Sequence, residues 1–280
     1  MSILSFLRTT HKNKNIDIPY IGRTFAIVFF VIFLSMQILI SYLLISDGLY
    51  ATGTYADVLH DTNEVFEYID RTYSNKQELQ FLSAYKKIIP NSNLDQGAFN
   101  NYYNDFYNYT SKDTMVSGTC SEVAVTLLTK AHKVNQGSYE YIFRTVMNTA
   151  KGNGYWKSDK GTNSAQIDSL VTKTFDFLNS SKKGNNDHLN IFSNLVNNID
   201  SGKTSVFSCI GHSMHAVGYA EYSIKYSEKI LFFKRNVAKT EYFVIVNDGW
   251  FNASSNEKNE QYSYYPASLI STRFTLTKVV

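Results

Sequence analysis

TSVFSCIGHSMHAVGYAEY, residues 204–222, carries the strongest structural signal in this chain of 280 residues. β-Branched and aromatic residues dominate the stretch and a glycine interrupts it, so it predicts strands over 204–210 and 212–222. Similar runs at 230–234, 242–247 and 273–279 predict further strands. We therefore expect an antiparallel sheet in the second half of the chain.

Helices are expected before these strands. An apolar stripe that starts after Cys120, preceded by hydroxyl residues that can cap a helix, predicts a helix at this point. Further helices are expected over 139–150 and near 165–178 and 188–200. Helices followed by strands predict the α+β class.

Residues 55–90 also show helical spacing, because apolar residues such as Val65, Ile69, Leu79 and Leu82 recur at steps of three and four. Three interpretations of this predicted helix stay open: a stalk, an inhibitory pro-segment, or a helical face that packs on the main domain. The polar stretch 97–119 has no clear period and is expected to be a loop.

The charges are unevenly distributed along the chain. Residues 1–46 hold four basic side chains and one acidic one, whereas residues 47–280 hold 23 of each. No basic stripe remains to indicate nucleic-acid binding. The hydrophobic content of 44% is sufficient for a real core and excludes a disordered, charged tail.

A run of 23 uncharged residues, 24–46, follows the basic N-terminus and is long enough to cross a bilayer. Its apolar part is longer than that of a signal peptide and no clear cleavage site follows, so a retained signal anchor is favoured over a cleaved signal or a buried core helix. The positive flank places the N-terminus inside and residues 47–280 outside the cell. The predicted organisation is a basic cytoplasmic tail (1–23), a single transmembrane anchor in the cell membrane (24–46), a helical stalk or pro-like segment (47–94) and a globular domain (95–280).

Three residues with complementary chemistry fall at informative positions in this domain. Cys120 lies at a helix start, His212 opens a strand, and Asp248 follows another strand directly after Asn247. A helix N-terminus and an imidazolium both lower the pKa of a thiol, and the imidazole then serves as base and acid. A carboxylate or an amide orients the imidazole, so Asp248 is the preferred third residue and Asn247 the alternative.

Residues 95–280 resemble the papain-like cysteine peptidases, most closely the compact bacterial forms related to bacteriocin-leader-processing peptidases. The resemblance rests on the order Cys–His–Asp and on three short motifs: Val217-Gly218-Tyr219 at the papain spacing after His212, Asp248-Gly249-Trp250 in the register of Asn-Ser-Trp in papain, and Ile199-Asp-Ser-Gly-Lys203 before the histidine strand. It implies a helical half that bears the cysteine, packed on an antiparallel sheet half that bears the histidine and the aspartate. No cofactor and no metal are implied.

The chain departs from the family pattern at two places. Papain relatives usually have a glutamine about six residues before the cysteine, which donates to the oxyanion, whereas this chain has Thr114 there. The second oxyanion donor is therefore unidentified. Glu122, two residues after the cysteine, would oppose ionisation of the thiol unless its side chain points away.

His215 competes with His212 for the role of base. Side chains three residues apart on one strand face opposite sides, and the spacing to Val-Gly-Tyr favours His212. A disulfide between Cys120 and Cys209 would remove the nucleophile. A metal site built from Cys209 and the two histidines would need ligands from both faces of one strand to converge.

The sequence thus predicts a membrane-anchored, extracellular cysteine peptidase that acts through Cys120, His212 and Asp248 and an acyl-enzyme intermediate. The expected partners are a peptide or protein substrate and, through the N-terminal helix, the membrane. One alternative is a CHAP-type cell-wall amidase or endopeptidase, in which the histidine usually follows the cysteine more closely than the 92 residues found here. The other is a non-catalytic surface-binding protein on a peptidase-like fold.

Overall fold

The structure, a computed structural model, describes residues 29–33, 35–36, 53–89, 119–135, 137–157, 160–230, 233–247 and 262–280. The chain divides into two compact units, Met1–Tyr50 and Ala51–Val280. In the first unit, residues 29–33 and 35–36 are helical. Within the described residues, no helix has the length and apolar character needed to cross a membrane. The predicted tail (1–23) and most of the predicted anchor (24–46) lie outside the described residues.

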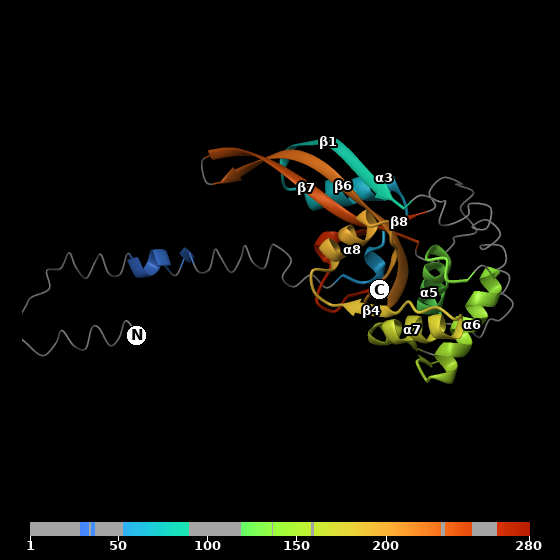
Figure 1. The fold of residues 1–280 in the computed structure, drawn as a ribbon. Helices are drawn as coiled ribbons and strands as arrows, with labels where there is room; N and C mark the ends of the chain where they lie inside the picture. The colour runs from blue at the N-terminus through green and yellow to red at the C-terminus, as the bar shows by residue number, and fades with distance from the viewer. Residues whose placement is uncertain are drawn as a thin grey trace, which may run out of the picture. The chain divides into compact units, whose positions relative to one another are not determined.

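A seven-stranded antiparallel sheet forms the centre of Ala51–Val280 (Figure 1). Its order is β4-β9-β5-β6-β7-β8, and β1 pairs with the later part of β6, on the same edge as β5. The strands are β1 (Gln77–Ile88), β4 (Gly184–Asp187), β5 (Ser205–Cys209), β6 (His212–Ile230), β7 (Phe233–Asn247), β8 (Ser263–Pro266) and β9 (Thr275–Val279). Helices packed against this sheet confirm the predicted α+β class.

Helices cover both faces of the sheet. On one face, α5 (Cys120–Ala131), α6 (Tyr139–Gly152) and α7 (Ile167–Phe177) share a core with Val206. On the other face, α8 (Ile191–Asp200) shares a core with Phe207. These two neighbouring residues of β5 serve different cores because side chains alternate along a strand. The helices predicted from apolar spacing after residue 119 are confirmed.

The helix predicted over 55–90 is wrong before residue 62, where a 3-10 turn over 55–57 stands apart from it, and beyond residue 72. There α3 (Thr62–Thr72) ends, and residues 77–88 form β1, which pairs with β6. Leu82, which helical spacing placed on the apolar stripe, is 55% exposed, and Tyr85 nearby is 52% exposed. The physical reason is a long-range contact. The edge of β6 provides backbone hydrogen-bonding groups for this segment, and the local spacing of apolar residues does not show that such a partner exists.

The hairpin of β6 and β7 is longer than the sequence suggests. Its strands have 19 and 15 residues, where separate runs at 212–222, 230–234 and 242–247 were predicted. The sequence analysis did not predict β4, β8 or the small sheet of β2 (Trp156–Lys157) and β3 (Gly161–Thr162). Three 3-10 helices complete the described elements: η2 (Tyr55–Asp57), η3 (Ser164–Gln166) and η4 (Ala267–Leu269).

Candidate functional site

Cys120 is the first residue of α5, so its sulfur lies at the positive end of the helix dipole. Its cap residue, Thr119, makes no side-chain capping hydrogen bond. Burial raises the pKa of the Cys120 thiol above its usual range, and the nearby Glu122 raises it further. The neighbouring backbone of Ser213 and the hydroxyl and backbone of Ser121 act in the opposite direction on this pKa. The resting side chain is therefore a thiol.

Three buried serines connect the start of α5 to the sheet. Ser121 Oγ lies 3.1 Å from Ser213 Oγ, which lies 2.9 Å from Ser208 Oγ. Ser121 Oγ also donates to the carbonyl of Thr162 in β3, at 3.3 Å. Because Ser208 and Ser213 are paired across β5 and β6, this serine chain holds the helix start against the turn between these strands. The serine chain carries no sequence signal, since isolated serines in strands form no motif.

His212 is the first residue of β6 and pairs with Cys209 across the β5–β6 turn. Its side chain is nearly buried, with 5% of the residue exposed. The ring of Tyr55 packs on the imidazole with 4.5 Å between ring centroids. The Tyr55 N–H also donates to the carbonyl of Ile210, at 3.2 Å, so the segment around η2 is bonded to the turn beside the histidine. Tyr55 was not among the predicted site residues.

His215 lies on the opposite face of β6, among residues that are buried under α5. Within the described part of the chain, neither ring nitrogen has a hydrogen-bond partner. Burial, with a smaller contribution from His132, lowers the pKa of His215 from 6.5 to about 3. The imidazole is therefore neutral near pH 7. Its face of β6 is the one that α5, with Cys120 at its start, covers, whereas His212 lies on the other face with Cys209.

The two candidates for the orienting residue differ in what the structure describes. Asn247 is the last residue of β7 and lies directly opposite His215. Directly opposed residues of an antiparallel pair share a face, so Asn247 lies on the side of His215 and not on the side of His212. Asp248 lies outside the described residues.

The Glu122 side chain lies inside the protein and not in solvent. It is fully buried, and its Oε1 accepts a hydrogen bond from the Thr162 hydroxyl at 2.5 Å. Burial raises the pKa of the carboxyl group, while the hydrogen bond from Thr162 lowers it. The ionised carboxylate raises the pKa of Cys120. Glu122 therefore opposes ionisation of the thiol, as the sequence led us to expect.

The second cysteine forms no disulfide. Both Cys120 and Cys209 are free thiols, and burial raises the pKa of Cys209 to about 12. The disulfide left open by the sequence is therefore absent. His215 faces away from Cys209 and His212, and the described residues contain no group of three or more His, Cys, Asp or Glu arranged to hold a metal ion.

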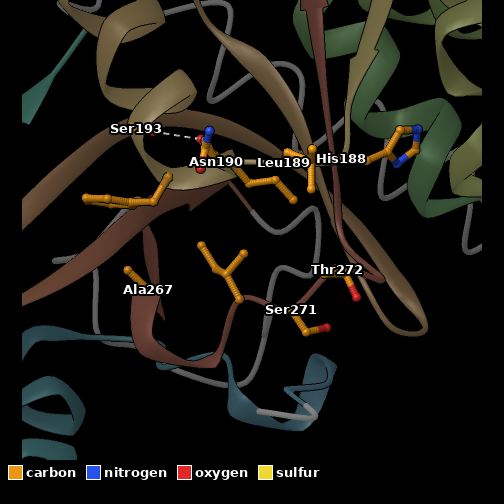
Figure 2. Close-up of a pocket in the computed structure, with 10 residues that line it drawn as sticks. His188, Leu189, Asn190, Ser193, Ala267, Ser271 and Thr272 are labelled. Carbon is orange, nitrogen blue, oxygen red and sulfur yellow. Dashed lines mark hydrogen bonds between the residues drawn. The ribbon is translucent and has the colours of Figure 1, made fainter. Parts of the chain in front are cut away.

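Two surface hollows lie away from these residues. One, of about 310 Å³, is formed by the start of α8 and by the segment around η4, and it is lined by His188, Asn190, Ser271 and Thr272 among others (Figure 2). The other, of about 530 Å³, lies between α6 and α7. Neither is lined by Cys120 or His212.

No family model matches the chain, and comparisons with curated proteins and with solved structures found no similar protein. The function is therefore inferred from the geometry of this chain and from its sequence motifs.

Proposed function

We propose that the chain is a cysteine peptidase with a papain-like catalytic arrangement, anchored in the cell membrane with its C-terminal domain outside. One observation carries the proposal. Ser121, the residue after Cys120, lies 3.1 Å from Ser213, the residue after His212, measured between the two Oγ atoms. The helix start that bears the thiol thus lies against the start of β6, the strand that bears both histidines, and this chemistry requires a thiol beside an imidazole.

The proposed reaction starts with transfer of the thiol proton of Cys120 to His212, while the sulfur attacks the scissile carbonyl carbon. The positive end of α5 favours the thiolate, and the Cys120 N–H is available to the oxyanion. His212 then donates its proton to the leaving amine as the C–N bond breaks. Water hydrolyses the thioester and returns the proton through His212, and Asp248 holds the imidazole in the productive orientation.

Gly218 of the Val-Gly-Tyr motif has a structural role in this fold. A Cβ atom on Gly218 would lie 2.3 Å from the carbonyl oxygen of Lys87 in β1, so only glycine fits here without a shift of the backbone. The irregular register between Ala216 and Gly218 falls at the same point. The motif thus allows a neighbouring strand to lie close to the histidine strand in this chain.

A second candidate function is a non-catalytic binding protein on a peptidase-like fold. The raised pKa of the buried Cys120 thiol and the Tyr55 ring on His212 favour it, because both oppose formation of a reactive ion pair. The two functions differ in one measurable property, the dependence of thiol reactivity on His212.

The test is the rate at which a limiting dose of iodoacetamide or E-64 modifies the full-length protein, with the modified cysteine identified by mass spectrometry. A peptidase predicts fast labelling of Cys120 and at least about tenfold slower labelling in His212→Ala, because general-base assistance contributes at least that much. His215→Ala is the matched comparison: His212 as the base predicts an unchanged rate, whereas slower labelling in His215→Ala alone would assign the base to His215, on the face of β6 that α5 covers. Slow labelling that is indifferent to His212→Ala would contradict the peptidase proposal and support the binding protein.

A further inference from the structure

The far end of the β6–β7 hairpin extends past the strand that supports it. The first residue of β1, Gln77, pairs with Ser227, whereas β6 and β7 remain paired as far as Ile230 and Phe233. The last residues of the hairpin therefore form a two-stranded ribbon. Figure 1 shows this ribbon as the end of an arm that projects beyond α8.

Phe233 lies at this end and is 76% exposed, the largest exposed fraction of any large hydrophobic side chain described in Ala51–Val280. A lone exposed hydrophobic residue is ordinary on a flat surface. At the end of this ribbon, the described elements leave most of the ring exposed.

Basic side chains lie on both faces of the ribbon near Phe233: Arg235 on the face of Phe233, and Lys229 and Lys234 on the other. Residues 225–236 contain four basic side chains and one acidic one, a net charge of +3, although residues 47–280 as a whole are balanced. Lys229 and Lys234 lie directly opposite each other, and like charges in such a pair destabilise an isolated sheet. Lys234 is partly compensated by Glu78, 2.6 Å away in β1. Lys225, Lys229, Phe233, Lys234 and Arg235 are called the hairpin-end surface below.

We propose that the hairpin-end surface docks on a bilayer that contains anionic phospholipids. The ring of Phe233 enters the boundary between headgroups and acyl chains, where aromatic side chains are favourable. The lysines and Arg235 meet the lipid phosphates, which relieves the repulsion between Lys229 and Lys234. Charge selects this occupant over a second copy of the chain, because two surfaces of the same positive charge repel each other.

This docking is independent of the proposed peptidase activity, since no residue of the surface belongs to the candidate site. If the chain is also anchored through residues 24–46, the docking adds a second attachment point. An attachment within the same chain raises the effective concentration of the membrane at the hairpin end. A modest intrinsic affinity is then sufficient to fix the orientation of the domain.

The test places a fluorescent reporter at the hairpin end. The full-length Phe233→Trp variant is reconstituted with vesicles of phosphatidylcholine, alone or mixed with phosphatidylglycerol, and quenched with brominated lipid. Phe177→Trp is the matched control, because Phe177 is a 66% exposed phenylalanine on α7. We expect blue-shifted, quenched emission at position 233 only with the anionic lipid, and none at position 177. Equal quenching at both positions, or none at position 233, would overturn the proposal.

Charge variants sharpen the result. In the Phe233→Trp background, Lys229→Gln with Lys234→Gln should lower the ratio of docked to free hairpin ends about 25-fold at low salt, because each basic residue near an anionic surface contributes about fivefold. High salt should weaken docking of the parent in the same direction. A blue shift without vesicles that grows with protein concentration would mean contact between copies and would refute lipid docking. Cys120→Ala should change none of these signals, so the result is separate from the test of the peptidase.

Discussion

Ser213→Ala is the substitution that tests most directly how α5 is held against the sheet. The Ser213 hydroxyl shares hydrogen bonds with Ser121 and Ser208, and all three side chains are buried. After the substitution, Ser121 keeps the carbonyl of Thr162 as a partner. Ser208 keeps no side-chain partner among the described residues. Loss of one net hydrogen bond and one unsatisfied buried hydroxyl together cost about 2–3 kcal/mol in the free energy of unfolding.

The double variant distinguishes a shared hydrogen-bond chain from three independent contacts. Ser208→Ala alone removes one bond and leaves Ser213 bonded to Ser121, a cost of about 1 kcal/mol. In the double variant with Ser213→Ala, no unsatisfied hydroxyl remains at position 208. Its total cost should therefore be about 2 kcal/mol, roughly 1–2 kcal/mol less than the sum of the single costs.

The assay is urea unfolding of the full-length variants, followed by tryptophan fluorescence. Ser223→Ala is the matched control on the same strand, because its hydroxyl is only partly buried and lies 3.4 Å from Thr240. It should cost less than about 0.5 kcal/mol. Costs of Ser208→Ala and Ser213→Ala that add within about 0.5 kcal/mol would refute the shared chain.

Three further predictions address the sheet, the buried acid and the covered histidine. Gly218→Ala should destabilise the protein by about 1–3 kcal/mol in urea unfolding, because the new Cβ meets the backbone of β1, whereas Gly152→Ala, with open space around it, should not. Burial raises the folded-state pKa of Glu122 above its ordinary 4.5, so the folded protein binds more protons than the unfolded one. The free energy of unfolding should therefore fall as the pH rises from about 4.5 through the folded pKa. Glu122→Gln should flatten this decline, and an unchanged slope would contradict the prediction. Tyr55→Ala should uncover the imidazole beneath it and raise the alkylation rate of Cys120 several-fold, with equal rates in parent and variant as the contrary result.

Local patterns predicted much of the architecture. The helix that starts at Cys120 and the strand that starts at His212 lie where capping residues, apolar spacing and β-branched runs indicated. These features depend on neighbours within a few residues along the chain, and a sequence displays such neighbours directly. The same patterns failed for 77–88, where a segment with helical spacing instead pairs with a strand about 140 residues later.

The candidate site was predictable only in part. Spacing to Val-Gly-Tyr selected His212, a choice that stays a prediction, and the structure places His215, opposite Asn247, on the face of β6 that α5 covers. Tyr55 and the serine chain carried no sequence signal, because each gains its role from a contact with a distant element.

The sequence by itself determined which segments are apolar on one side, where helices after residue 119 begin, and which residues carry thiol, imidazole and carboxylate chemistry. Only the tertiary structure decided that β1 joins the sheet, that Glu122 is buried beside Cys120, and that Tyr55 packs on His212. The physical reason is that burial and pairing are properties of the folded whole. The free energy of a buried carboxyl group or of a paired strand edge depends on the groups around it in space, and those groups come from distant parts of the chain.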